Sequence, residues 1–167
     1  INKELLKRIY SQLDNMLSYY SKVTVVFLQL HQKRYTESNT LITKFFGLLK
    51  KRLSKHYGTR IGHVWVREKH RAEAQHYHIA VMLNGHRCQK CYRVTQYAQQ
   101  IWERLGEEHF SYRVRNRIYR IERREHNREL QAVRTRLSYL AKNATKDAGN
   151  YRQVSNTSRI AFNPSKL

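Results

Sequence analysis

The chain has 167 residues, with 33 Lys and Arg against 12 Asp and Glu, giving a formal net charge of +21. This length fits a single domain, 1–167, that can bury a core without disulfides or a structural metal. An unshared charge excess destabilises the compact state by self-repulsion, so a polyanionic partner is favoured, with nucleic acid first and an anionic membrane surface second. No stretch approaches the ~20 consecutive apolar residues of a membrane span.

The N-terminal sequence and the number of cysteines indicate where in the cell the protein is expected. No signal peptide is visible and the chain does not begin with Met, so we expect a fragment of a longer protein or a trimmed form. Two cysteines do not make a secreted disulfide framework. We therefore expect a cytoplasmic protein without a membrane partner.

Helix-periodic and strand-like segments alternate along the chain. Apolar residues at helical spacing predict helices, whereas alternating or β-branched runs predict strands. In chain order we expect a helix at 1–20, a strand at 22–31, a helix at 41–57, strands at 60–68 and 76–84, a helix at 94–106, a strand at 110–121, a helix at 129–146 and an irregular or edge segment at 148–167.

The strands at 60–68 and 76–84 are joined by a short polar connector, so they must be antiparallel. The continuous apolar run after His78 predicts a strand covered on both faces, and therefore a central one. The fold class that we expect is α+β, with a central antiparallel sheet of about five strands flanked by helices.

The stretch "QHYHIAVML" begins a buried-looking strand with two histidines, His76 and His78. Residues two apart on a strand project to the same face, so both imidazoles aim at one point. Folding the hairpin about residues 71–73 brings Glu68 opposite them, with Glu73 in the connector as the rival carboxylate. Two imidazoles and a carboxylate can hold a divalent ion and leave positions open for substrate. Mg²⁺ or Mn²⁺ suits such a site if phosphate oxygens complete it.

A later helix offers a second reactive pair, Tyr139 and Lys142, which lie at i and i+3 and share a face. A phenol can attack the phosphorus of a metal-bound phosphodiester and form a covalent intermediate. The ammonium can offset charge on the phosphorane oxygens or donate a proton to the leaving oxygen. Each of these residues also has a plainer interpretation when it is taken alone. The histidines could be hydrogen-bonded or surface residues, the tyrosine could occupy a core position, and the lysine could lie on a solvated face.

Together, His-hydrophobic-His on a strand and Tyr-x-x-Lys on a later helix resemble the HUH endonucleases. The chain is most similar to the replication initiation proteins of inovirus-type filamentous phages and their relatives in prophages and satellite elements. The resemblance spans most of residues 60–160, while 1–59 match only in general plan. The matching stretches, in the family's order, are "VWVRE", "HYHIAVMLN", "YAQQIWERLG", "SYLAKNATK" and "VSNTSRI".

The resemblance implies an RRM-like α+β fold and nicking of single-stranded DNA, with or without a hairpin at the nick site. It implies that Tyr139 becomes linked to the 5′-phosphate and that the free 3′-hydroxyl starts rolling-circle replication with a host helicase and polymerase. His76, His78 and Glu68 would hold the metal, and Lys142 would assist. Thr135 and Asn143 occupy the positions four residues away from Tyr139, so a single-tyrosine enzyme is implied.

Basic residues form two further groups. If 110–121 is one strand, then Arg113, Arg115 and Arg117 form a row of guanidinium groups along one face, which suits a DNA backbone. A second cluster, Lys50, Lys51 and Arg52, lies on the helix at 41–57, and Lys146 follows Lys142 by one helical turn. A solvated surface is the plainer alternative for charge runs of this kind. The large net charge favours contact with DNA, and exposed tyrosines can stack unpaired bases.

The cysteines form a single Cys-x-x-Cys, Cys88 and Cys91, with His86 two residues before it. A structural zinc usually needs four ligands, and only His109 remains to be recruited by folding. The alternative is a strand-to-helix loop with incidental thiols.

Other functions remain compatible with these residues. The same chemistry serves transposases, relaxases and nickases directed at a competitor's genome. A non-catalytic, basic nucleic-acid-binding module with structural histidines is the alternative from another class. A membrane-surface protein is third, because the basic residues are spread over several predicted elements rather than gathered on one amphipathic helix.

Overall fold

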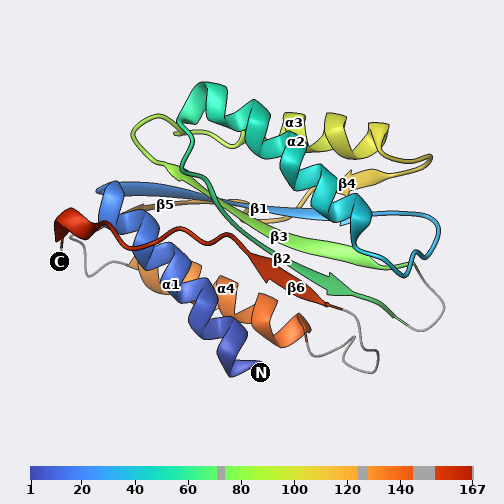
Figure 1. The fold of residues 1–167 in the computed structure, drawn as a ribbon, viewed down its shortest axis with the longest axis horizontal. Coiled ribbons are helices and arrows are strands. Elements are labelled where there is room, and N and C mark those ends of the chain that lie inside the picture. The colour runs from blue at the N-terminus through green and yellow to red at the C-terminus, as the bar shows by residue number, and fades with distance from the viewer. Residues whose placement is uncertain (71–73, 124–127, 145–152, 167) are drawn as a thin grey trace.

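The computed structural model describes residues 1–70, 74–123, 128–144 and 153–166. Within these residues the chain is α+β, with an antiparallel sheet of six strands between two layers of helices (Figure 1). The strands are β1 (Lys22–His31), β2 (Gly62–Glu68), β3 (His76–Asn84), β4 (Phe110–Tyr112), β5 (Ile118–Glu122) and β6 (Ser155–Thr157). Their order is β4-β1-β3-β2-β6, with β5 also paired to β1.

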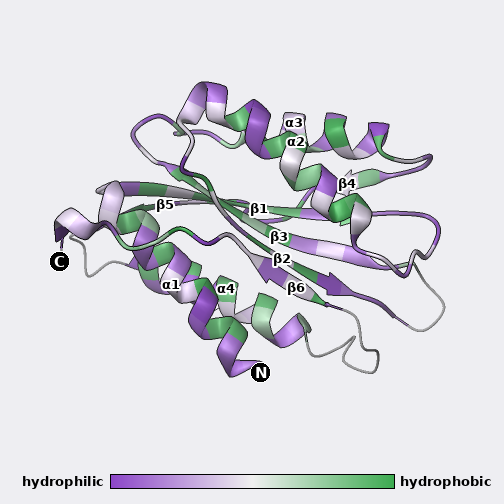
Figure 2. Ribbon diagram, in the orientation of Figure 1, coloured by the Kyte–Doolittle hydropathy of each residue, from purple (hydrophilic) through white to green (hydrophobic). Residues whose placement is uncertain are grey.

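The helices cover the two faces of the sheet in pairs. Figure 1 shows α2 and α3 on one side and α1 and α4 on the other. Each helix carries both hydrophilic and hydrophobic bands in Figure 2, as an amphipathic helix with one buried face does. The α-helices are α1 (Lys3–Tyr19), α2 (Thr40–Tyr57), α3 (Tyr92–Arg104) and α4 (Arg128–Asn143), and a 3-10 turn follows at Pro164–Lys166.

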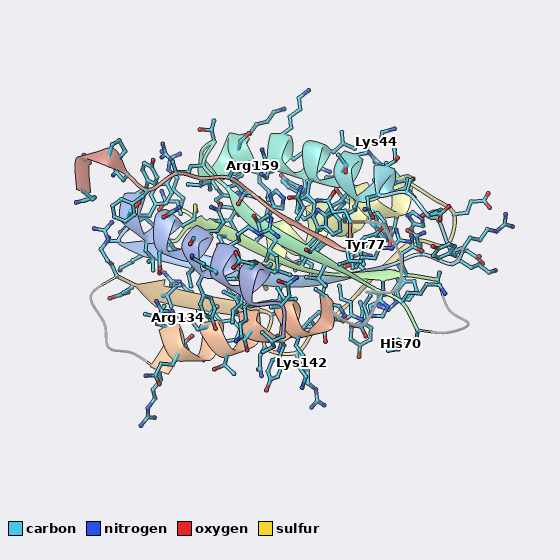
Figure 3. The ribbon with its side chains drawn as sticks, turned by 60° about the horizontal axis from the view of Figure 1, so that its bottom comes forward. Lys44, His70, Tyr77, Arg134, Lys142 and Arg159 are labelled. Atoms are coloured by element: carbon cyan, nitrogen blue, oxygen red, sulfur yellow. The ribbon has the colours of Figure 1, made fainter. Side chains whose placement is uncertain are left out.

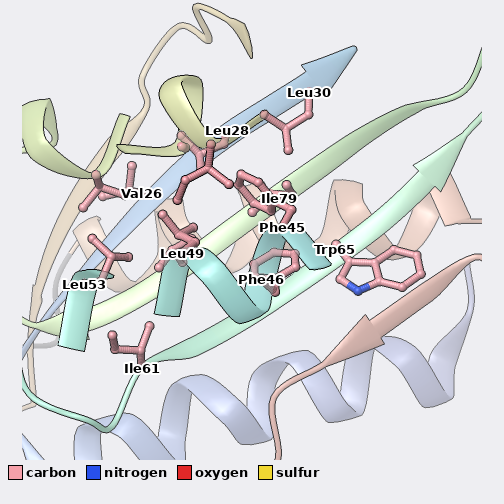
Figure 4. Packing of buried hydrophobic residues seen from close by; sticks show 14 of the residues in the cluster. Val26, Leu28, Leu30, Phe45, Phe46, Leu49, Leu53, Ile61, Trp65 and Ile79 are labelled. Carbon is pink, nitrogen blue, oxygen red and sulfur yellow. The ribbon is translucent and has the colours of Figure 1, made fainter. Parts of the chain in front are cut away.

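Two hydrophobic cores result, one on each face. The core under α2 and α3 includes Phe45, Tyr77 and Trp102, whose rings meet edge to face (Figure 4 shows its α2 side). The core under α1 and α4 is aliphatic and includes Leu13 and Leu137. Alternation along β3 explains the division, because Tyr77 enters the first core while Ala80 and Met82 enter the second. The predicted central position of this strand is confirmed, since β3 lies between β1 and β2.

The predicted strand at 110–121 is wrong as a continuous element. Tyr112 pairs with Gln29 and Ile118 pairs with Val26, so residues 113–117 lie opposite only two residues of β1. Asn116 adopts a φ of 49°, a left-handed conformation that Asn tolerates better than most residues, and this bulge divides the strand into β4 and β5. The row of arginines expected along one strand face therefore does not form.

The end of the chain is more ordered than the expected irregular tail, although its edge-strand alternative is confirmed. Strand β6 pairs with β2, with Val66 opposite Ser155. Gln12 of α1 then fixes the following residues, because its amide donates to the carbonyl of Ile160 (3.0 Å) and its oxygen accepts from the amide of Ile160 (3.0 Å). The split of 110–121 and the presence of β6 together explain why the sheet has six strands rather than about five.

A buried histidine in β2 predicts acid sensitivity. His63 stacks on Phe46 at 4.3 Å, and its Nδ1 has no hydrogen-bond partner among the described residues. Burial, followed by the charge of Lys50, lowers the pKa of His63 to about 3. The unfolded chain titrates near the usual value of ~6.5, so between these two pH values it binds the extra proton and the fold does not.

We therefore expect the free energy of unfolding to fall as the pH drops from about 6.5 toward 3. His63→Phe should flatten this dependence, because the stack on Phe46 remains and the titrating group is gone. Urea titrations at several pH values measure the free energy of unfolding and its dependence on pH. His86→Phe, at an exposed histidine, is the control and should keep the original slope; an unchanged slope in His63→Phe would contradict the prediction.

Candidate metal centre and adjoining cavity

The hairpin of β2 and β3 brings Glu68, His76 and His78 together as predicted. Glu68 lies directly opposite His76 in the strand register, and Val66 lies opposite His78. One ligand atom from each of the three residues lies within 4.8 Å of the other two, a spacing that a small rearrangement around an ion would close. Glu73, the rival carboxylate, lies outside the described residues.

The carboxylate is at the centre of this cluster. Glu68 Oε2 lies 2.8 Å from Nε2 of His78 and 3.9 Å from Nε2 of His76, and its side chain is only 4% exposed. Its second oxygen, Oε1, lies 2.9 Å from Nε2 of His70, a half-exposed residue after β2. A buried carboxylate between imidazoles can hold a divalent cation, and the donor set of two nitrogens and one oxygen leaves coordination positions open. The residues therefore fit a metal, while its identity does not follow from them.

The neighbouring strand β1 contributes a layer that the sequence analysis did not find. His31 lies opposite His76 in the register, and their rings stack at 4.9 Å with planes 4° apart. Gln29 lies opposite His78 and donates to Nε2 of His31 (2.8 Å). The stack supports the imidazole of His76 from the side, and Gln29 in turn holds His31, as partners behind metal ligands commonly do. The alternation Gln29-x-His31 indicates a polar face at this end of β1, but it does not indicate which strand lies beside it.

A cavity of about 240 Å³ joins this cluster to α4. His78 and Gln29 contribute from the sheet, and Tyr139 contributes from the helix. The Tyr139 side chain is 54% exposed, so it is accessible from solvent as well as from the cavity. The pairing of an imidazole with a phenol in one cavity is what the sequence analysis expected of these residues. The cavity is lined by Phe27, Leu28, Gln29, His78, Ile79, Val114, Arg136, Tyr139, Leu140 and Asn143.

Of the residues that the structure describes, the cation that lines this cavity is Arg136 rather than Lys142. Arg136 precedes Tyr139 by one helical turn, and its guanidinium lies 5.0 Å from the centre of the Phe27 ring. Lys142 is exposed on the following turn of α4 and is not among the lining residues (Figure 3 labels it, with His70 beyond β2). The spacing Arg-x-x-Tyr was visible in the sequence and was overlooked. The role expected of Lys142 stays a prediction.

The predicted basic residues are distributed over both faces. Lys50, Lys51 and Arg52 lie on α2, across the sheet from α4, so they are not continuous with the cavity of Tyr139. Arg52 is also engaged locally, with its guanidinium 3.9 Å from the centre of the Tyr97 ring. Burial lowers the pKa of Lys50. Lys146 lies outside the described residues.

The arginines of the bulge remain close to the cavity although they form no row. Arg113 and Arg115 are exposed, and Arg117 is half-buried. Val114, between the first two, is a lining residue of the cavity. Contact with a phosphate backbone stays a prediction for these three residues.

Neither His86 nor His109 joins Cys88 and Cys91 in a group that could bind zinc. Cys88 is buried, and burial raises the pKa of its thiol. His86 is hydrogen-bonded to Ser21 (2.9 Å), and His109 to the carbonyl of Trp102 (3.0 Å). Among the residues that the structure describes, Glu68, His76 and His78 are the one group with ligand atoms close enough for a metal.

The fold and this site define an α+β protein with a carboxylate-imidazole cluster on its central strands and a tyrosine beside it. Residues 1–155 match the model of the YagK/YfjJ C-terminal domain, and the chain belongs to that family. Searches of curated proteins and of solved structures gave no significant match. None of the described helices has the length and apolar character needed to cross a membrane.

Proposed function

We propose that the chain is a metal-dependent endonuclease and strand transferase of single-stranded DNA, with Tyr139 as its nucleophile. The observation that carries the proposal is the shared cavity of His78, Arg136 and Tyr139 beside the Glu68, His76 and His78 cluster. The resemblance of these motifs to the HUH endonucleases supports it. The net charge of +21 suits a polyanionic substrate.

Glu68, His76 and His78 would hold the metal, and Mg²⁺ or Mn²⁺ is the ion that suits a site completed by phosphate oxygens. When bound, such an ion polarises the scissile phosphate and orients it for in-line displacement. His31, itself held by Gln29, keeps the imidazole of His76 in place, and the burial of Glu68 keeps its carboxylate from rotating into solvent. The chain would thus fill part of the coordination sphere of the ion and leave the remaining positions to a phosphodiester.

The chemical step exchanges one phosphodiester bond for another. The Oη atom of Tyr139 attacks phosphorus and loses its proton to solvent, which the exposed ring allows. The bond from phosphorus to the 3′-oxygen breaks, and that oxygen takes up a proton from the Lys142 ammonium or from water. The products are a 5′-phosphotyrosine and a free 3′-hydroxyl, with no net change in protons. A later attack by a 3′-hydroxyl reverses the step and rejoins a strand.

The biological use that we infer is initiation of rolling-circle replication of a phage or mobile element, because a free 3′-hydroxyl primes a host polymerase. A transposase, a relaxase or a nickase of a competitor genome would use the same site. These uses differ in the DNA that is recognised and in associated domains. The chemistry is therefore the part to test first.

The test is denaturing electrophoresis after the protein is incubated with end-labelled single-stranded DNA and Mn²⁺. The label must lie on the 3′ side of the cut, since that fragment carries the 5′-phosphate. We expect a protein band that carries the label and disappears with EDTA. If a random-sequence pool yields no such band, the chain is a basic nucleic-acid-binding module without this chemistry.

Arg136→Ala is expected to slow adduct formation about 10- to 100-fold, because a hydrogen bond from a charged group contributes about 1.5–3 kcal/mol. Mn²⁺ affinity should not change, since Arg136 is outside the ligand cluster. Single-turnover rates and calorimetric titration with Mn²⁺ measure the two quantities. Arg134→Ala is the matched control, because Arg134 faces Asp14 instead (3.4 Å). Equal rates of adduct formation in the two variants would show that Arg136 has no part in the reaction.

A further inference from the structure

A second cavity, of about 290 Å³, lies between α3 and the bulge that separates β4 from β5. The helix contributes Tyr92 and Thr95, and the bulge contributes Arg113 and Arg117. Nothing in the chemistry proposed for Tyr139 uses these residues.

The rings at this cavity are exposed to an unusual degree for large aromatic residues. Tyr92 is 70% exposed and Tyr112 is 56% exposed, and they come from different elements, α3 and β4. Exposed aromatic groups gathered at a hollow commonly mark a binding surface. Arg113 and Arg117 add positive charge beside the rings. A pair of phenol rings with guanidinium groups at their edge suits a flat, aromatic ligand that carries phosphate.

This cavity adjoins the one that Tyr139 lines. Phe27, Leu28 and Val114 line both of them. The bulge lies where the two cavities meet, because residues 113–116 leave the ladder of β1, whereas the carbonyl of Arg117 still accepts a hydrogen bond from the amide of Phe27 (2.8 Å). The two cavities therefore lie close enough together for one DNA strand to contact both.

We propose that the cavity between Tyr92 and Tyr112 is a binding site for an unpaired nucleobase of the DNA strand, next to the phosphate that Tyr139 attacks. This inference rests on the proposed function and adds a place where the substrate is held. The site requires a single strand, because bases in a duplex are already stacked on their neighbours and cannot offer their faces. Arg113 and Arg117 contact the phosphate of the same nucleotide. Since both rings accept any base, the site contributes affinity more than sequence preference.

The test compares ordinary and abasic DNA, because an abasic strand keeps the phosphates and lacks the bases. Binding is measured by fluorescence anisotropy in EDTA, in a Tyr139→Phe background, so that no cleavage is needed. Tyr92→Ala combined with Tyr112→Ala should weaken binding of a random single-stranded oligonucleotide about tenfold, as expected for the loss of base stacking. Affinity for the abasic oligonucleotide should not change. Phe162→Ala, at an exposed aromatic residue after β6 on the opposite edge of the sheet, is the control and should bind as the parent does.

A loss of the same size on both oligonucleotides, or no loss on either, would overturn the inference. Photocrosslinking with 5-iododeoxyuridine is the second measurement, and it should attach DNA to a peptide that contains Tyr92 or Tyr112. Crosslinks confined to other peptides would also overturn it. Because neither assay uses cleavage, a failure of the phosphotyrosine chemistry would be seen separately, in the labelled-band assay.

Discussion

Tyr139→Phe is expected to abolish the covalent DNA adduct completely while leaving the fold and the affinity for single-stranded DNA unchanged. The substitution removes one oxygen atom, and that atom is the proposed nucleophile. The ring stays in place and keeps its contacts on α4, and among the described residues that line the cavity no other carries a phenol. Mass spectrometry of the wild-type adduct should locate the added nucleotide phosphate on the peptide that contains Tyr139.

A matched control is available in Tyr35, which is 42% exposed on the loop after β1. Tyr35→Phe removes the same atom from a tyrosine outside the cavity, so adduct formation should proceed at the wild-type rate. If Tyr139→Phe keeps the adduct and Tyr35→Phe loses it, the nucleophile has been assigned to the wrong residue. If both variants keep it, the attachment is not to either tyrosine.

The cluster of Glu68, His76 and His78 was predictable because it depends on local rules. A strand sends His76 and His78 to one face whatever the rest of the fold does. The short connector forces an antiparallel partner, and counting back from its middle brings Glu68 opposite His76, as the structure has it. Each of these steps needs only neighbours in the sequence.

What was missed depends on contacts between distant segments. His31 supports His76 only because β1 pairs with β3, and no feature of β1 alone indicates that partner. The sequence likewise does not say which face of the sheet a helix covers, so it could not place the basic cluster of α2 across the sheet from α4. The bulge at 113–117 was predicted as part of a strand because its arginines stand at every second position, which is the pattern expected of a strand.

The segment 113–117, where the prediction of a continuous strand was wrong, is also the segment that borders the two cavities. A continuous strand at 110–121 would have paired with β1 without a break, whereas residues 113–116 now lie outside the ladder and pairing resumes where the Arg117 carbonyl accepts from the Phe27 amide (2.8 Å). The bulge, with Asn116 in its left-handed conformation, leaves room for the two cavities that share Phe27 and Leu28. Bulges often occur beside active sites, where they redirect side chains.

Removal of the carboxylate is the second change with a large expected effect. Glu68→Gln keeps the size of the side chain and removes the charge that lies between the imidazoles of His76 and His78. We expect Mn²⁺ affinity to fall at least 10- to 100-fold, because this is the loss that follows when even a residue behind a metal ligand is changed. Adduct formation should be abolished at micromolar Mn²⁺. Calorimetric titration and the labelled-band assay measure the two effects.

Three comparisons decide what a positive result means. DNA affinity in EDTA should stay within a few-fold of the wild type, because the cluster binds DNA only through the ion; a parallel loss of binding would assign Glu68 and the histidines a structural role. His78→Ala should match Glu68→Gln, since both remove one of the three proposed ligands. Glu73→Gln is the decisive control. A loss of Mn²⁺ affinity there, with Glu68→Gln unaffected, would place the carboxylate ligand in the connector and show that the ion lies beyond the end of the hairpin.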